Sequence, residues 1–195
     1  MDIPQAPGMR RRILQEAAVL FARSGYNAVS TRQIAEACGI TKAALYYHFV
    51  DKENLLAAIL SENLDVLIQL IASCRSGLPD ARGRLQAFVQ AVFAQPAEQR
   101  AIIRLASQEL PNLTPEFRAR FSEQYHRQFI GSLAVILEDG MRAGELKSAN
   151  PLHAAWLLLG MMYPFFYPGN ERQAGSEPAS EWILSVFFEG MAAHA

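Results

Sequence analysis

The sequence predicts an all-α fold of about nine helices, in which a small N-terminal unit of three helices precedes a larger helical body. Apolar residues recur at helical spacing along almost the whole chain, and no segment alternates convincingly as a β-strand does. Three helix-start signals follow one another between residues 30 and 51. Positive charge also gathers there: residues 10–50 carry six Lys/Arg and two Asp/Glu, a net +4, whereas residues 54–195 carry eleven and fourteen, a net -3. Such asymmetry indicates a nucleic-acid-facing unit on a body with another task.

The composition indicates a folded protein from a reducing compartment. The chain has 195 residues, of which 51% are apolar, so it can bury a sizeable core. Its cysteines, Cys38 and Cys74, form no CxxC pair and are expected to be reduced and buried. The N-terminus lacks the apolar run of a signal peptide, and the most apolar stretch, residues 154–167, is too short to span a bilayer. We therefore expect a soluble, cytoplasmic protein without a membrane partner.

The N-terminal helices are predicted from one apolar stripe and three caps. Ile13, Ala17, Leu20 and Phe21 form the stripe of the first helix, which Gly25 ends. Ser30 and Gln33 then form a capping box, and Thr41 and Asp51 are further N-caps, so helices are expected over 31–38, 42–48 and 52–74. Each cap also has the two apolar residues of a hydrophobic staple, namely the pairs Val29–Ile34, Ile40–Leu45 and Val50–Leu55.

Proline and glycine mark the limits of the remaining helices. Pro115 and Pro151 follow Thr114 and Asn150, the arrangement of an N-cap followed by proline in the first turn. The expected helices are 81–94, 96–111, 115–144, 151–167 and 178–192, with a polar loop over 168–176. The helix that starts at residue 52 is expected to be the only one long enough to join the N-terminal unit to the body.

Residues 31–49 have the pattern of a helix-turn-helix. Two short helices are joined by Gly39, Ile40 and Thr41, and Gly39 suits the left-handed backbone of such a turn. After the buried faces are assigned, the second helix still exposes Lys42, Ala43, Ala44, Tyr46, Tyr47 and His48. These side chains offer hydrogen-bond donors for phosphate and an apolar flank for base methyl groups. The pattern therefore predicts a DNA-binding surface.

The run from Ile13 to Leu56 resembles the N-terminal domain of TetR-family repressors. The resemblance rests on Ala17-Ala18, Leu20-Phe21, Gly25-Tyr26, Ser30-Thr31-Arg32-Gln33-Ile34-Ala35, Gly39-Ile40-Thr41-Lys42, Leu45-Tyr46-Tyr47-His48-Phe49, Lys52-Glu53 and Leu55-Leu56. It implies a DNA-binding domain over residues 1–53 and an effector-binding and dimerisation domain over residues 54–195. It also implies a transcriptional regulator, most simply a repressor that binds a palindromic operator as a dimer and is released by a small effector.

The resemblance further assigns roles to residues of the helix-turn-helix. Lys42, Ala43 and Tyr46 are expected near base edges, and Arg32 near either bases or phosphate. The expected phosphate contacts are Thr31, Thr41, Tyr47, His48 and Lys52. Bland alternatives remain for several of them: Thr31 supports the Ser30 cap, Tyr46 packs on the first helix, or His48 only closes its helix.

The body offers candidate effector residues, expected to surround a small apolar or aromatic molecule. Phe117, Phe121, Tyr125 and Phe129 recur every four residues, and Trp156 lies in the next helix. The resemblance implies a pocket in this body, and we place it at Phe88, Phe121, Tyr125 and Trp156. Polar groups could come from Tyr125, His126, Gln108 and Glu109. The alternative is that the aromatic stripe is only core.

The last two helices, about 151–167 and 178–192, are expected to form a homodimer. Apolar residues recur there every three or four positions: Ala154, Leu158, Gly160, Met161 and Met162 in one helix, and Ala179, Ile183, Val186, Phe187, Gly190 and Met191 in the other. Paired about a two-fold axis, the stripes would make a four-helix bundle. The alternative is that they pack only on each other and on the body.

Other functions find less support in the sequence. No nucleophile–base cluster or glycine-rich phosphate loop is present, so an enzyme is not expected. Glu123 and His126 have the spacing of one di-iron ligand pair, but the second pair that such a site needs is missing. We therefore expect neither a metal nor a cofactor. A DNA-binding protein controlled by another protein, and not by a small molecule, stays open.

Overall fold

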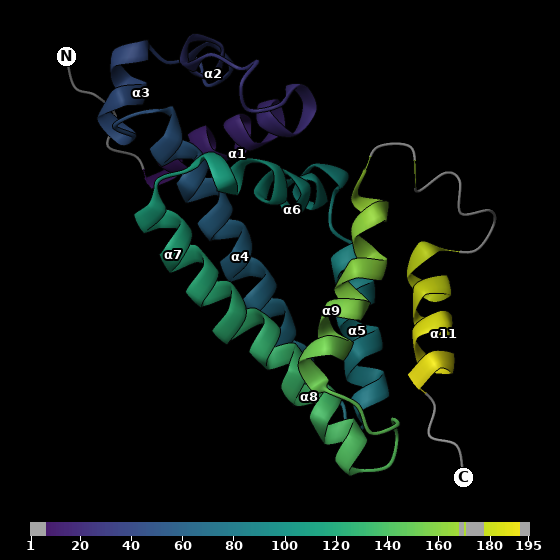
Figure 1. Ribbon diagram of the computed structural model, residues 1–195. Helices are drawn as coiled ribbons and strands as arrows, with labels where there is room; N and C mark the ends of the chain where they lie inside the picture. The colour runs from purple at the N-terminus through teal and green to yellow at the C-terminus, as the bar shows by residue number, and fades with distance from the viewer. Residues whose placement is uncertain (1–6, 168–169, 171–177, 192–195) are drawn as a thin grey trace.

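The computed structural model describes residues 7–167, 170 and 178–191, which form helices without a β-strand (Figure 1). At one end lie α1 (Pro7–Ser24), α2 (Thr31–Ala37), α3 (Lys42–His48) and the start of α4 (Lys52–Gly77). The larger part contains α5 (Ala81–Phe93), α6 (Ala97–Glu109), α7 (Pro115–Gln124), α8 (Gly131–Arg142), α9 (Pro151–Met162) and α11 (Ala179–Met191). The predicted all-α class, with a helix-turn-helix unit and a helical body, is confirmed.

Three short segments vary the helical geometry. The 3₁₀ turn η1 (Leu110–Asn112) follows α6, and the π-helical η2 (Tyr125–Ile130) joins α7 to α8, so the long helix expected over 115–144 contains one wider turn. The helix expected to reach Tyr167 ends as an α-helix at Met162 and continues as the 3₁₀ turn η3 (Tyr163–Phe166). Pro164 explains this end, because proline has no N–H for an α-helical hydrogen bond. Most of the loop expected over 168–176, and residue 192, lie outside the described residues.

The three N-terminal caps form as expected. The Ser30 capping box is complete, the Thr41 hydroxyl accepts from the Ala44 N–H at 3.1 Å, and an Asp51 carboxylate oxygen accepts from the Asn54 N–H at 2.7 Å. The staple predicted for Val50 is wrong, since this side chain is 80% exposed. Phe49 and Asp51 both have extended backbones, so successive side chains point to opposite sides. Phe49 points into the core, and Val50 therefore points to solvent.

Two hydrophobic cores share α4. One core, which we call the head core, joins α1, α2 and α3 to Leu55, Leu56, Ile59 and Leu60 of α4. The other, the body core, contains Leu64, Leu67 and Ile71 of α4 together with side chains of α5, α8, α9 and α11. By length and composition α4 is the one described helix that could cross a membrane, but its apolar residues fill these two cores. The division into 1–53 and 54–195 stays a prediction, and the head core runs on to Leu60.

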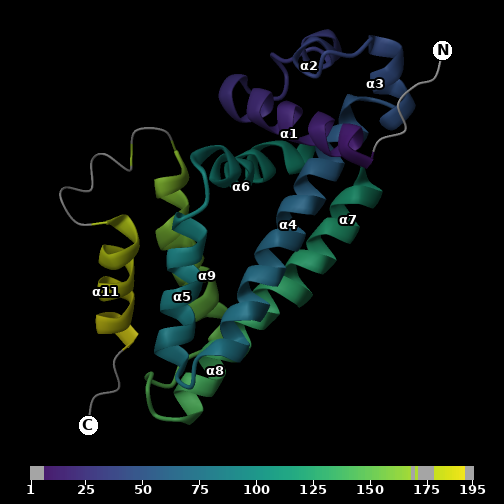
Figure 2. The same cartoon turned by 180° about the vertical axis from the view of Figure 1, so that it is seen from behind.

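The expectation that α4 alone joins head and body is wrong, because α6 also contacts the head. In both views α6 lies across the molecule directly beside α1 (Figures 1 and 2). Ile102 and Leu105 of α6 are part of the head core. The Arg104 guanidinium donates to the Ala22 carbonyl, near the C-terminal end of α1, at 3.0 Å. The head therefore contacts α6 as well as α4, and Leu113, just before α7, also belongs to the head core.

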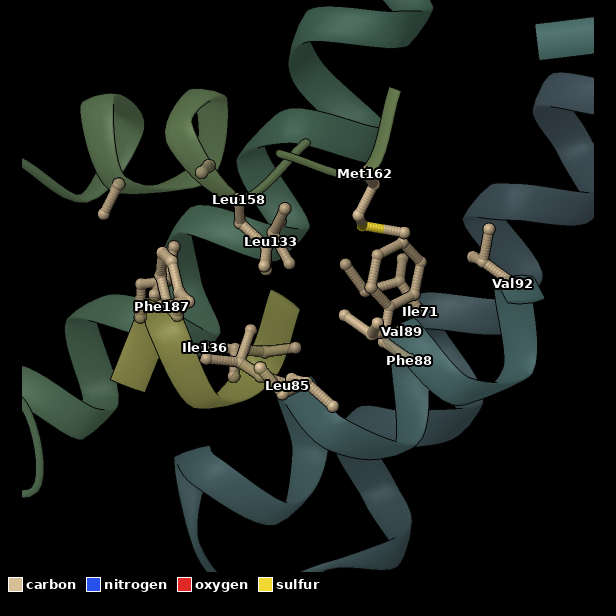
Figure 3. Packing of buried hydrophobic residues seen from close by; sticks show 14 of the residues in the cluster. Ile71, Leu85, Phe88, Val89, Val92, Leu133, Ile136, Leu158, Met162 and Phe187 are labelled. Atoms are coloured by element: carbon tan, nitrogen blue, oxygen red, sulfur yellow. The ribbon is translucent and has the colours of Figure 1, made fainter. Parts of the chain in front are cut away.

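The apolar stripes of the last two helices are divided between the core and the surface. Ile183, Phe187 and Met191 of α11 are buried in the body core, and so are Ala154, Leu158 and Met162 of α9. Figure 3 shows Phe187 packed with Leu158, Leu133 and Ile136. For these residues the alternative of packing within the chain is correct. Other residues of these helices are exposed: Leu152, Leu157 and Gly160 of α9, and Trp182, Val186 and Gly190 of α11.

Candidate nucleic-acid interface and ligand cavity

The turn at Gly39 and buried side chains of the head core fix the geometry of the helix-turn-helix. Gly39 has φ 64°, in the left-handed region expected for it, and the next N–H, of Ile40, donates to the Ala35 carbonyl at 3.0 Å. Ile34 of α2 and Leu45 of α3 are buried in the head core. The outer face of α3 is therefore fixed relative to α1 and α2.

The structure leaves all of the predicted DNA-binding residues at least partly exposed on the head. Lys42, Ala43, Thr41 and Arg32 are exposed, and Tyr46 and Tyr47 expose 42% and 61% of their surface. The half-buried members of the set are Thr31, His48 and Lys52. Tyr46 is therefore not buried against the first helix. Large aromatic side chains that are exposed on a short helix are typical of a binding surface.

Contacts among these side chains orient them. The Tyr46 and Thr31 hydroxyls lie 3.4 Å apart, which joins α3 to the start of α2, and the Lys42 ammonium is 5.6 Å from the centre of the Tyr46 ring. Arg32 is held by Glu36 at 2.7 Å on exposed helix surface. The Lys52 ammonium lies 4.1 Å from the centre of the Tyr26 ring, and partial burial lowers the pKa of this lysine.

A cavity of about 350 Å³ lies in the body, within the size range of small-molecule sites. Its wall combines α4, α6, η1, α7, η2 and η3. Seven lining residues are apolar: Leu60, Leu64, Leu67, Ile103, Ala106, Leu110 and Phe121. Six carry a polar group: Asn63, Ser107, Ser122, Tyr125, His126 and Tyr163.

The structure brings only part of the predicted effector set together. Phe121 and Tyr125 line the cavity, with their rings stacked 6.4 Å apart. Phe88 does not line it, because α5 directs this side chain into the body core, where it is fully buried (Figure 3). Trp156 does not line it either: it lies behind the wall, with ring centres 5.9 Å from Tyr125 and 5.7 Å from His126. Gln108 and Glu109, suggested as polar groups, are also absent from the lining.

Several polar groups of the wall were missed by the sequence reasoning. The hydroxyls of Ser107 and Tyr163 are in hydrogen-bond contact, and the Asn63 amide is buried. Tyr125, which the sequence did suggest, also lies in the wall, and burial raises its pKa to about 12. A signal for Asn63 existed, since it lies on the apolar stripe of α4 between Leu60 and Leu67.

The cavity lies at the boundary between the two cores. Leu60 belongs to the head core, Leu64 and Leu67 belong to the body core, and Phe121 packs against both. A molecule in this cavity would therefore touch both parts of α4 at once. It would also touch α6 through Ile103, Ala106 and Ser107, one turn from the Arg104 contact to α1.

The Glu123–His126 pair shows other interactions. Glu123 forms an ion pair with Arg127 at 3.3 Å, and the His126 ring packs edge-on against Tyr125. Among the residues that the structure describes, no group of three or more His, Cys, Asp or Glu side chains is placed to hold a metal ion.

Comparison with known proteins agrees with this architecture. Residues 13–59 match the family model for bacterial regulatory proteins of the tetR family, and residues 79–164 match that for the tetracyclin repressor-like C-terminal domain. The transcriptional repressor KstR2 of Rhodococcus jostii is 27% identical over 98% of this chain and 95% of its own. KstR2 of Mycolicibacterium smegmatis is 31% identical over 75% of this chain and 72% of its own.

A solved structure extends the likeness to three dimensions. The crystal structure of AibR in complex with isovaleryl coenzyme A and operator DNA is similar with a TM-score of 0.75 and 25% identity, covering 96% of this chain and 100% of that one. The helix-turn-helix, the body and the sequence matches thus lead to one conclusion. The chain belongs to the TetR family of bacterial regulatory proteins and is a DNA-binding transcriptional regulator.

Proposed function

We propose that this protein is a homodimeric repressor that binds a palindromic operator through α3 and leaves it when a small apolar molecule fills the cavity at the boundary of the two cores. The position of that cavity is the observation that carries the proposal. A molecule bound in a cavity within one core would contact either the head or the body, but not both. An occupant at the boundary changes the orientation of the head relative to the body. This orientation determines the position of each recognition helix. A regulator that acts on DNA is expected to be cytoplasmic and not an enzyme.

The operator must fix two recognition helices about one DNA turn apart, roughly 34–36 Å, or a multiple of it. A ligand that shifts α4 and α6 changes this spacing, so ligand and operator compete through conformation. Linkage then requires reciprocity: operator lowers ligand affinity by the same factor by which ligand lowers operator affinity. A thermal-shift screen of lipophilic compounds, followed by calorimetry of each hit on free and operator-bound protein, tests this. Equal affinity for the two forms would rule out the proposed competition.

Acyl-coenzyme A thioesters are a second effector class, favoured by the AibR complex with isovaleryl coenzyme A. The apolar cavity suits an acyl chain. Among the described residues that line it there is no lysine or arginine, so the coenzyme phosphates would have to stay outside. Control by a partner protein is the remaining alternative, and it predicts that no small molecule releases the operator.

The DNA contacts lead to a prediction for α3. Lys42→Ala or Tyr46→Ala is expected to leave folding intact and to weaken specific operator binding by about 1–3 kcal/mol, because each side chain is exposed where base edges are expected. Ala43 has no polar atom to lose, so its contact is apolar. Lys52→Ala is expected to weaken all DNA sequences alike and to reduce the salt slope by about one unit. Titrations of operator and random DNA at two salt concentrations measure both effects.

The remaining members of the surface, Thr31, Arg32, Thr41, Tyr47 and His48, are proposed as phosphate contacts, with Arg32 able to reach a base. Val66→Glu on the exposed side of α4 is a suitable control, since it lies outside this surface. Unchanged operator affinity in Lys42→Ala, Tyr46→Ala and Lys52→Ala together would contradict the assignment of α3 as the recognition helix.

Arg104 is expected to carry part of the signal from the cavity to the head. Its guanidinium holds the Ala22 carbonyl and lies 5.4 Å from the centre of the Tyr167 ring, and Ser107 in the cavity wall is one turn further along α6. Arg104→Met should therefore reduce the coupling between a hit compound and operator by roughly 0.5–2 kcal/mol. Operator affinity without compound should change little.

The measurement is operator affinity with and without a saturating hit compound. Arg127→Met is the matched control, because the ion pair that Arg127 makes within the described residues is with Glu123, four residues earlier, and is exposed. If Arg104→Met responds to the compound as strongly as the control does, α6 does not transmit the signal and α4 acts alone.

A further inference from the structure

The Asn63 side chain is a buried polar group whose hydrogen bonding is incomplete. It is 5% exposed, and its amide nitrogen has no hydrogen-bond partner among the described residues. Gln95 Oε1 and Arg104 Nε are likewise buried without a hydrogen-bond partner in the described part of the chain, but neither residue lines the cavity, whereas Asn63 does. Buried donors in folded proteins are normally paired, so an unpaired one calls for a partner that arrives from outside.

Asn63 is one of the residues that line the cavity. Its amide nitrogen is itself covered, so a rotation of the amide group about the Cβ–Cγ bond is the step that presents this donor to a molecule in the cavity. Around Asn63 the wall is apolar: Leu60, Leu64 and Leu67 lie on the same helix, and Ile103 and Phe121 come from α6 and α7. An apolar molecule in this cavity can bury its hydrocarbon against these side chains. One polar atom of that molecule would meet Asn63.

The chemistry of the amide decides what that atom must be. An amide nitrogen carries two N–H donors and no acceptor, so it requires an acceptor from the bound molecule. Tyr125, which stays protonated, can donate as well. The lining has no lysine or arginine among the described residues, so a buried carboxylate or phosphate would lack a permanent counter-charge. A neutral acceptor fits these conditions. The carbonyl oxygen of a ketone or a thioester is a strong acceptor of this kind and carries no hydrogen that would itself need a partner.

We propose that Asn63 selects the effector by donating a hydrogen bond to a carbonyl oxygen on an otherwise apolar molecule. This inference rests on the proposed function and specifies the chemistry of its effector. Asn63 stands on α4 between Leu60 of the head core and Leu64 of the body core. The same hydrogen bond that recognises the carbonyl therefore acts on α4 at the boundary, so recognition and release from DNA share one residue.

The test uses matched probes that differ in one carbonyl. One arm compares rigid alicyclic and aryl ketones, such as 4-phenylcyclohexanone, with hydrocarbons in which CH₂ replaces C=O. The other arm compares isovaleryl-coenzyme A with free coenzyme A. Together the two arms show whether the recognised carbonyl belongs to a ketone or to a thioester. Thermal shift and calorimetry measure binding to the full-length dimer, and operator release measures the response.

Wild type is expected to bind carbonyl compounds about 10-fold to 100-fold more tightly than their CH₂ counterparts, the range for leaving one buried donor unpaired. Asn63→Leu, similar in volume but apolar, should lose this preference, keep its operator affinity and melt no lower than wild type. Asn63→Asp keeps the shape but replaces the donating nitrogen with oxygen, and it should lose the preference too. Gln69→Leu, on the exposed side of α4, should keep it.

Two outcomes would overturn the inference while leaving the proposed function in place. One is a set of operator-releasing compounds that wild type binds equally well with and without the carbonyl. The other is a carbonyl preference that persists in both Asn63→Leu and Asn63→Asp. If no probe and no compound of a broader lipophilic screen binds a wild-type protein that holds its operator, the ligand-responsive function itself fails, and the role of Asn63 fails with it.

Discussion

Replacing Phe49 with alanine is expected to unfold the head and abolish operator binding, at a cost of about 3–5 kcal/mol. Phe49 ends α3 and is 6% exposed, and its backbone N–H closes the helix by donating to the Leu45 carbonyl at 3.0 Å. The Arg10 guanidinium of α1 lies 5.0 Å from the centre of the Phe49 ring and also pairs with Glu62 of α4. The ring is therefore packed where α1, α3 and α4 meet. Truncation leaves a cavity where three helices meet.

Unfolding in Phe49→Ala should be confined to the head. The body core contains no residue of α1, α2 or α3 among its buried members, so the body should stay folded and dimeric after the head melts. Thermal melting followed by circular dichroism should show a separate low-temperature transition for Phe49→Ala, with a dimer still seen in sedimentation.

Tyr47→Ala is the matched control for Phe49→Ala. It removes a neighbouring aromatic ring from the same helix, but this ring is mostly exposed. It should therefore weaken DNA binding without a change in melting. A Phe49→Ala protein that binds operator at wild-type strength would show that the packing of α3 does not depend on this ring.

The parts of the fold that sequence predicted well are those that local chemistry decides. Ser30, Thr41 and Asp51 each satisfy N–H groups within three residues of themselves, so the limits of α2, α3 and α4 depend on little else. Gly39 is similar, because its positive φ is a property of one residue. The failed Val50 staple is the instructive exception. The cap formed, but the direction of the side chain before it depended on the extended backbone that carries Phe49 into the core.

The parts that were predicted poorly depend on which side of a helix meets which neighbour. Phe88 and Phe121 look alike as aromatic residues in helices, yet one fills the body core and the other lines the cavity. Only the placement of α5 and α7 against α4 separates them. The contact of α6 with α1 was also out of reach, because Arg104 and Ala22 are far apart in the chain and their bond involves a backbone carbonyl.

The largest effect on function is expected from a charge on the outward side of α9 and α11. We propose that this side forms the two-fold interface, and its centre is a groove between the two helices lined by Leu157, Met161, Val186 and Gly190. Val186→Glu should dissociate the dimer. Lys147 and His153 line the same groove, but two like charges buried near the axis would still repel each other, and an uncompensated buried charge costs about 3–5 kcal/mol.

Phe187→Glu, which the stripe alone would suggest, is not a valid test. Phe187 is 2% exposed within a single chain, so a charge there would unfold the body whether or not a dimer exists. Val186 is exposed in the single chain, so a glutamate there is expected to leave the fold of the chain intact. Leu157→Glu, on the facing helix, provides an independent second variant. Val66→Glu places the same charge at an exposed valine of α4 and is the control.

Sedimentation and operator titration then give a joint result. Val186→Glu and Leu157→Glu should be folded monomers, and both should lose operator affinity by a factor of about 10²–10⁴, the range contributed by linking two binding units. Every DNA-contacting residue is untouched in these variants, so the loss can come only from separating the two recognition helices. Val66→Glu should remain dimeric and bind as wild type does. A monomeric wild type that still represses, or both variants remaining dimeric, would contradict the α9–α11 interface, and the cavity would then have to control each head within a single chain.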